Sequence, residues 1–352
     1  MSHFRTRGGY SRPASTFAAL STARPTESQT FHLPDGRMLG YAEYGHPTGY
    51  PVITFHGFPS SRVEAYPLDR IAQLQGLRIL SLERPGFGLS TFQPQRRILD
   101  WPADVEAFAR HKGLRRFAII GVSGGGPYAL ACAKALPNQM MLSVGLFASG
   151  PPWVAGRQHM PWFARWPQWL VNFWPGGYRL LAGALVGTVN WLIRTRFVTR
   201  RIDKFLEASA RKAKEEPSPE ADLELVGAED FTTEQRRERL LSLVWNEPFA
   251  QGTAGFILET KLLSDPTWGF EFEDVEYGPI RIWHGAQDSN APIQMIRYMA
   301  ERLPNAVLTE FEDTHFTMAR NFSRALSELV SEQEKLKYRE AQLQTEPGEL
   351  SS

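Results

Sequence analysis

The chain has 352 residues, of which 42% are hydrophobic and 22% are charged, so it can bury a large core without disulfides or structural metals. Its formal net charge of +1 excludes the strong electrostatic field with which a protein attracts nucleic acid or a strongly acidic partner. The single cysteine, Cys132, excludes an internal disulfide and a metal site built from cysteines.

No apolar run reaches the roughly 20 residues that a membrane span requires. The longest run, residues 180–193, contains Asn190 and is bounded by Arg179 and Arg194, so we interpret it as a buried helix. The first 26 residues are rich in arginine, serine and threonine and contain no acidic residue. This composition is typical of a mitochondrial transit peptide and equally of a disordered tail. The single cysteine suits a reducing compartment, so we expect an intracellular, cytoplasmic protein. The composition of the first 26 residues makes mitochondrial import the alternative.

Short runs with strand character alternate along the chain with helical patterns. Strands are predicted at residues 31–33, 38–44, 52–55, 78–82, 117–121, 142–148, 280–283 and 307–311. Helices are predicted at residues 62–75, 102–111, 125–136, 293–303 and 316–334. Several of the strands are continuous apolar runs, which is typical of strands covered by helices on both faces. The alternation predicts an α/β fold with a mostly parallel central sheet flanked by helices.

The alternation stops between residues 151 and 270, where the patterns are helical only. A helical insert between two sheet strands is most simply a cap over one edge of the sheet. The sequence therefore predicts five segments. They are a disordered or targeting tail (1–28), the first part of the core (29–150), the helical cap (151–270), the second part of the core (271–334) and a disordered tail (335–352).

One short motif carries reaction chemistry. Residues 121–125 read Gly-Val-Ser-Gly-Gly, which matches the G-x-S-x-G nucleophile elbow. A serine on such a sharp turn occupies strained backbone, so its neighbours must be small. The motif alone is short enough to arise by chance. Here a strand candidate precedes it and a helix candidate follows it, which is the context that the motif requires. We predict Ser123 as the nucleophile.

A second turn supplies hydrogen-bond donors. Residues 56–59 read His-Gly-Phe-Pro and follow an apolar strand. A small-residue turn at a strand end can aim backbone N–H groups at a developing oxyanion. We predict that the N–H groups of Phe58 and Gly124 form this oxyanion hole, and that His56 has a structural role.

The base and its acid partner follow from chain order, because an acid and then a histidine come after a nucleophile elbow of this kind. Of the two histidines after the insert, His284 ends a strand candidate and leaves no room for the acid before it. His315 lies in a loop after the last strand, and Asp288 follows the strand at 280–283. We therefore predict a triad of Ser123, His315 and Asp288. The alternatives for the acid are Asp313 and Glu312.

Four motifs stand in order along the chain. They are HGFP at 56–59, RPGFGLS at 84–90, GVSGGGP at 121–127 and GAQD at 285–288. As a set they resemble the α/β-hydrolase fold family, in its capped serine-esterase and epoxide-hydrolase-like branch. The resemblance covers about residues 31–151 and 278–329. Epoxide hydrolases of this branch use an aspartate where this chain has Ser123, so the resemblance favours acyl chemistry over epoxide opening.

With this triad the sequence predicts a serine hydrolase that cleaves a carboxylic ester or a related acyl bond of a small, lipophilic molecule. Hydrolysis of a C–C bond beside a ketone stays open. So do two other classes, an acyltransferase with the same triad and a receptor-like ligand-binding protein on this fold. We expect no metal, no organic cofactor and no nucleic-acid partner, and the oligomeric state is left open.

Aromatic residues at the start of the insert are the one clue to the substrate. Trp153, Trp162 and Phe163 are predicted to line an apolar roof over the site. The same residues also suit the packing of the cap onto the core. A third interpretation is that this face makes peripheral contact with a membrane, because tryptophan and arginine are frequent at lipid interfaces.

Overall fold

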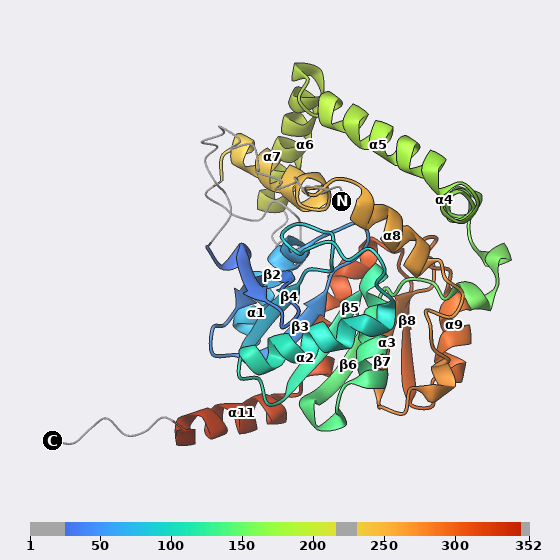
Figure 1. Cartoon of the computed structure of the whole chain (residues 1–352). Helices are drawn as coiled ribbons and strands as arrows, with labels where there is room; N and C mark the ends of the chain where they lie inside the picture. The colour runs from blue at the N-terminus through green and yellow to red at the C-terminus, as the bar shows by residue number, and fades with distance from the viewer. Residues whose placement is uncertain (1–24, 216–230, 346–352) are drawn as a thin grey trace, which may run out of the picture.

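The computed structural model describes residues 25–215 and 231–345, which form an eight-stranded sheet flanked by helices (Figure 1). The strand order is β1-β2-β4-β3-β5-β6-β7-β8. β2 pairs antiparallel with β1 and with β4, and all other neighbours pair parallel. The strands are β1 (Gln29–His32), β2 (Met38–Gly45), β3 (Tyr50–Phe55), β4 (Leu77–Leu82), β5 (Phe117–Val122), β6 (Met141–Phe147), β7 (Ile280–Gly285) and β8 (Ala306–Phe311). The predicted α/β fold with a mostly parallel sheet is confirmed.

Helices cover both faces of the sheet because successive side chains of a strand point to opposite faces. On β5, Ile119 packs into one core, whereas Ala118 and Ile120 pack into the other. The helices of the first core are α2 (Trp101–His111), α3 (Gly126–Ala135) and α9 (Ile293–Arg302), and those of the second are α1 (Asp69–Leu74) and α10 (Phe322–Leu329). Every residue of the central strand β3 is consequently buried.

The predicted helical insert lies between β6 and β7, above the sheet in Figure 1. Its helices are α4 (Trp162–Phe173), α5 (Pro175–Leu192), α6 (Arg196–Glu215), α7 (Thr233–Leu241) and α8 (Ala254–Leu263). The first two are weakly buried: α4 buries only Val171, and α5 buries three of its 18 residues. Among the described helices, none is long and apolar enough to span a bilayer.

The folded chain begins earlier than the sequence predicted. Glu27, which we assigned to the N-terminal tail, is fully buried, and its carboxylate pairs with Arg239 of α7 at 2.5 and 2.7 Å. Its carbonyl oxygen accepts from Arg62 Nε at 2.6 Å. These partners are distant in sequence, so local composition gave no sign of them. Most of the arginine-rich segment that we considered as a targeting signal, residues 1–24, lies outside the described residues.

The folded chain also ends later than predicted. The segment that we assigned to a disordered C-terminal tail from residue 335 continues as helix α11 (Glu332–Thr345). Lys335 is 1% exposed, and the Tyr338 ring lies 5.0 Å from that of Tyr50, centroid to centroid. These residues are ordered as a helix because they pack against β3, despite their polar composition.

Candidate active site

Ser123 stands on the turn that joins β5 to α3, where the sequence predicted the elbow. Its φ of 48° lies in the left-handed region, which residues with side chains seldom adopt. The neighbouring positions require glycine. A Cβ on Gly121 would overlap the carbonyl group of Gly125, and a Cβ on Gly125 would overlap that of Phe55. The turn therefore holds the Ser123 hydroxyl clear of the sheet edge.

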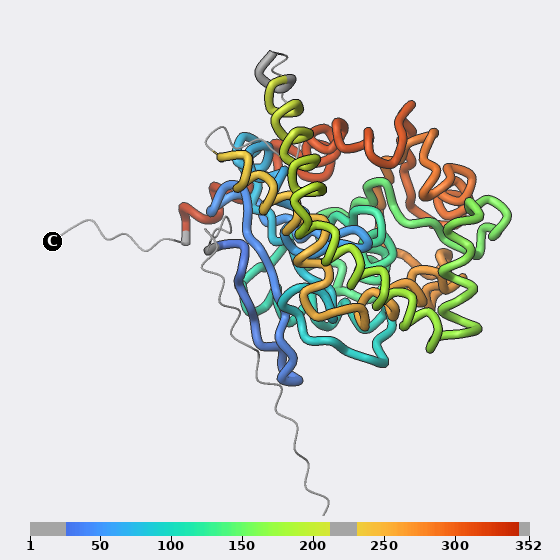
Figure 2. Tube along the Cα trace, turned by 90° about the horizontal axis from the view of Figure 1, so that it is seen from above, coloured from blue at the N-terminus to red at the C-terminus, as the bar shows by residue number. Residues whose placement is uncertain are grey.

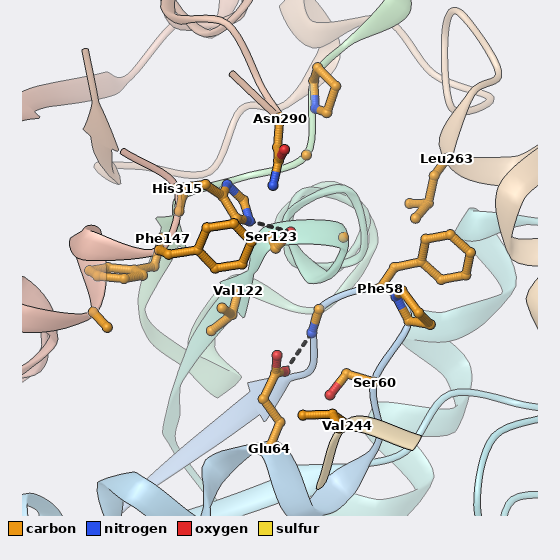
Figure 3. A pocket seen from close by; sticks show the side chains of 18 of the residues that line it. Phe58, Ser60, Glu64, Val122, Ser123, Phe147, Val244, Leu263, Asn290 and His315 are labelled. Carbon is orange, nitrogen blue, oxygen red and sulfur yellow. Dashed lines mark hydrogen bonds between the residues drawn. The ribbon is translucent and has the colours of Figure 1, made fainter. Parts of the chain in front are cut away.

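Three side chains from separate parts of the chain form a hydrogen-bonded series. Ser123 Oγ lies 3.1 Å from His315 Nε2 (Figure 3), and His315 Nδ1 lies 2.7 Å from Asp288 Oδ2. Asp288 follows β7 and His315 follows β8. Because the carboxyl ends of parallel strands meet at one edge of the sheet, the fold brings together the three residues that the sequence predicted.

Asp288 is held in one orientation by its own loop. Its Oδ1 accepts the N–H groups of Asn290 and Ala291 at 2.8 and 2.9 Å, which leaves Oδ2 to face His315. A carboxylate on this side accepts the Nδ1–H of the imidazole, so the Nε2 lone pair is directed at the Ser123 hydroxyl. This is the tautomer that a general base needs.

The residues weighed as alternatives have other partners. His284 is fully buried, with its Nε2 3.3 Å from Asp288 Oδ2, and burial lowers its pKa. The hydrogen-bond partner of its Nε2 is the carbonyl oxygen of Ala291 at 2.8 Å, so His284 holds the loop that follows Asp288. Asp313 accepts from Thr317 Oγ1 at 2.7 Å and from Asn321 Nδ2 at 2.8 Å. Its carboxylate therefore organises the loop that carries the candidate base.

The loop after β3 carries Phe58, one of the two predicted oxyanion donors. The Arg84 guanidinium donates to the carbonyl oxygen of Gly57 at 2.7 Å and also to that of His56. In a trans peptide the N–H points opposite to the C=O, so the Phe58 N–H points away from Arg84. A Cβ on Gly124 would lie 3.3 Å from the Phe58 nitrogen. Phe58 and Gly124 are therefore side by side at the pocket wall.

His56 packs behind this loop. Its Nδ1 lies 2.8 Å from the carbonyl oxygen of Gly57, and its Nε2 accepts the N–H of Arg84 at 3.1 Å. Complete burial, with the Arg84 charge nearby, keeps the pKa of His56 well below its ordinary value. A neutral ring with both nitrogens engaged stabilises the loop and exchanges no proton with a substrate.

A buried cluster fixes Arg84 in turn. Glu259 of α8 is fully buried; its Oε1 lies 2.7 Å from Arg84 Nε, and its other oxygen pairs with Arg96. The Tyr128 hydroxyl donates to Glu259 Oε2 at 2.9 Å. Burial raises the pKa of Glu259, but the two guanidinium groups outweigh it and lower that pKa. Sequence analysis missed this cluster because its members come from separate elements and share no local motif.

Sequence analysis also missed Glu64, which lines the pocket from the short helix η2 (Arg62–Leu68) (Figure 3). Its Oε2 accepts the N–H of Gly57 at 2.5 Å. A Cβ on Gly57 would lie 3.0 Å from Glu64 Oε1 and 3.3 Å from the Ser123 Cβ, so the carboxyl group is close to the nucleophile. Burial raises the pKa of Glu64 to about 7, against the opposing effect of the Gly57 hydrogen bond.

We expect Glu64→Gln to stabilise the protein above pH 7. The folded-state pKa is about 7 against an ordinary value of 4.5, so between these values the native protein binds more protons than the unfolded chain. The contribution of Glu64 to stability therefore falls as pH rises through this window. The variant lacks that loss, and its advantage over wild type grows to about 1–3 kcal/mol. Urea unfolding of both proteins at about pH 5 and about pH 8 measures it, and an advantage independent of pH would contradict the assignment.

Ser123 and His315 open into a pocket of about 1460 Å³ with largely apolar walls from the core and the insert. Trp153 and Phe163 line this pocket. Trp162 does not belong to the lining and is 71% exposed, which corrects the prediction for this residue. Successive residues of a helix point about 100° apart, so of these two exposed neighbours on α4 only Phe163 also reaches the cavity.

No group of three or more His, Cys, Asp or Glu side chains in the described part of the chain is arranged to hold a metal ion. Cys132 is fully buried on α3, and burial raises the pKa of its thiol. Its position is that of a small packing residue.

The protein is thus an α/β protein whose mostly parallel sheet presents a serine elbow, a histidine and an aspartate at its carboxyl edge, beneath a helical insert. The sequence matches the alpha/beta hydrolase fold family over residues 50–321. The chain belongs to this family, as its motifs predicted.

Proteins with similar sequences differ in the activities that their names give. A proline iminopeptidase from Xylella fastidiosa is 31% identical over 120 residues, which is 33% of this chain and 37% of that protein. A non-heme chloroperoxidase from Streptomyces lividans is 32% identical over 125 residues, or 35% of this chain and 45% of that protein. The matches therefore span less than half of these curated relatives.

Solved structures match over most of the chain. An esterase from Exiguobacterium antarcticum has a TM-score of 0.55 and 17% identity, and the match covers 86% of this chain and 98% of that one. An enol-lactonase from Burkholderia xenovorans has a TM-score of 0.55 and 16% identity, covering 86% and 99%. At such low identity these matches establish the fold and not the substrate.

Proposed function

We propose that the protein is a serine hydrolase that cleaves a carboxylic ester, or a related acyl bond, of a small lipophilic molecule through an acyl-enzyme. One observation carries the proposal. His315 Nε2 lies 3.1 Å from the Ser123 hydroxyl, and Nδ1 of the same ring lies 2.7 Å from the Asp288 carboxylate. This series opens into an apolar pocket, which suits a substrate with little charge.

The reaction follows from this geometry. His315 Nε2 takes the proton of Ser123 as Oγ attacks the acyl carbon. The oxyanion that forms accepts hydrogen bonds from the N–H groups of Phe58 and Gly124. His315, with Asp288 stabilising its charge, then gives the proton to the leaving alkoxide as the C–O bond breaks. Water repeats the sequence on the acyl-enzyme, which releases the acid and restores Ser123.

A second candidate is release of an N-terminal residue from a peptide. The observation in its favour is the partial similarity to proline iminopeptidases. The acyl-enzyme step is the same, and the leaving group would be an amine. The Glu64 carboxyl group near Ser123 could accept a hydrogen bond from an amino group of such a substrate. A simple ester has no amino group to donate this hydrogen bond.

The first experiment labels purified full-length protein with a fluorophosphonate probe and compares wild type with Ser123→Ala. We expect labelling that is lost in the variant. A series of p-nitrophenyl esters of increasing acyl length, run beside proline p-nitroanilide, then separates the two candidates. Faster turnover of a medium or long ester supports the esterase, and preference for the anilide supports the peptidase. A folded wild-type protein that does not label would overturn both.

A further inference from the structure

The outer side of the insert is unusually apolar. Twelve of the twenty exposed large hydrophobic side chains in the described residues lie between positions 162 and 197. We call them the α4–α5 face, which also includes one residue between these helices and one at the start of α6. They are Trp162, Phe163, Trp166, Trp169, Phe173, Trp174, Leu180, Leu181, Leu185, Trp191, Leu192 and Phe197. Figure 1 shows α5 as an outermost helix on the side away from the sheet, and Figure 2 shows the insert from above. An exposed apolar surface of this extent marks an interaction site.

The charge of the same segment has one sign. Residues 150–202 contain seven arginines and no lysine, aspartate or glutamate, whereas the whole chain has a net charge of +1. The arginines are Arg157, Arg165, Arg179, Arg194, Arg196, Arg200 and Arg201, and all seven are exposed. A partner for this surface must therefore combine apolar material with negative charge.

We propose that the α4–α5 face docks on an anionic lipid surface. Tryptophan and leucine side chains suit the boundary between headgroups and acyl chains, and the arginines suit anionic headgroups. None of the described helices can cross a bilayer, so α4 and α5 would lie in the plane of the interface. A second copy of the chain fits less well, because a two-fold interface would set this arginine-rich surface against itself without any carboxylate.

The face is continuous with the candidate active site. Phe163 belongs to the α4–α5 face and also lines the pocket, together with Ala164 and Pro167 of the same helix. Two further pocket residues, Phe205 and Phe316, are 63% and 79% exposed. The wall of the pocket thus reaches the surface through apolar side chains, and at Phe163 it does so within the docking face. An apolar molecule would pass from the lipid to the pocket without crossing open water.

The experiment is flotation of purified full-length protein with vesicles of phosphatidylcholine alone or mixed with phosphatidylserine. We expect binding to the mixed vesicles that weakens as salt is raised. Leu181→Glu/Leu185→Glu is expected to weaken this binding by about a hundredfold or more, because two leucine side chains lose their burial in lipid. Arg179→Glu/Arg194→Glu is expected to weaken it by about tenfold or more.

The matched control is Leu336→Glu/Leu343→Glu on α11, where both leucines are exposed, at 55% and 75%. This variant carries the same substitutions outside the face and should bind vesicles as wild type does. Thermal unfolding of each variant should match wild type, since none of the replaced side chains is buried. Vesicle binding needs no turnover, so its outcome is independent of the proposed hydrolysis.

Three results would overturn the proposal. One is wild-type protein that does not float with the anionic vesicles. Another is equal weakening by the α5 and α11 leucine variants. The third is a dimer in sedimentation equilibrium that Leu181→Glu/Leu185→Glu converts to a monomer, since a second copy would then cover the face.

Discussion

Ser123→Ala is expected to reduce turnover of the best ester by about 10⁵-fold or more, and His315→Ala by a similar factor. The two residues act as a unit, since the imidazole has no proton to take once the hydroxyl is gone. The double variant should therefore be no slower than either single variant. Steady-state rates of the three proteins, with circular dichroism to show that each is folded, provide the measurement.

The acid partner gives a sharper comparison within the same prediction. Asp288→Asn should lower kcat by about 10³–10⁴-fold, because the amide no longer fixes the Nδ1–H tautomer or stabilises the imidazolium. Asp313→Asn is the matched control. Its carboxylate binds Thr317 and Asn321, so we expect a rate within about tenfold of wild type. Equal losses in the two variants would remove the acid role from Asp288.

Glu259→Gln is expected to lower the free energy of unfolding by about 3–5 kcal/mol. The carboxylate lies between two buried guanidinium groups, Arg84 and Arg96. A neutral amide would leave both positive charges in a site that excludes water, which is the costly way to break a buried ion pair. Urea unfolding of the variant beside wild type tests this.

The control for that experiment is Glu106→Gln, which breaks an exposed pair with Arg110 one helical turn away. Surface pairs of this kind contribute at most about 0.5 kcal/mol. If Glu259→Gln proved as mild as Glu106→Gln, the cluster would not hold the insert to the core. If the fluorophosphonate probe labelled Ser123 only partially in a folded Glu259→Gln protein, we would infer that Arg84 no longer orients the loop at Phe58.

The sequence predicts those parts of the site that depend on local sequence motifs and on the order of elements along the chain. The elbow at Ser123 is one local turn with glycines that its geometry requires, and the strands on either side of the insert are continuous apolar runs. His315 and Asp288 followed from the order of elements, since each comes directly after a parallel strand. These features need no knowledge of tertiary contacts.

Other parts depend on contacts between distant segments, and no local pattern marks them. Glu64 becomes a pocket residue only because η2 folds back on the loop at Gly57. Glu27 meets Arg239 across 212 positions. Trp162 and Phe163 have the same composition signal and both are exposed, yet only Phe163 also lines the cavity, which depends on how α4 is rotated against the core.

The core supplies the groups proposed to react and the insert supplies much of the pocket, which has a consequence for how the substrate specificity of such a protein can change. The groups proposed to react lie before residue 125 or after residue 287, whereas nearly half of the pocket-lining residues come from residues 153–268. Replacing that stretch in a single exchange would give the cavity a new shape and leave the triad untouched. The exchange would succeed only if the incoming segment again supplied a carboxylate for Arg84 and Arg96, so new specificities are inherited together with that one acidic residue.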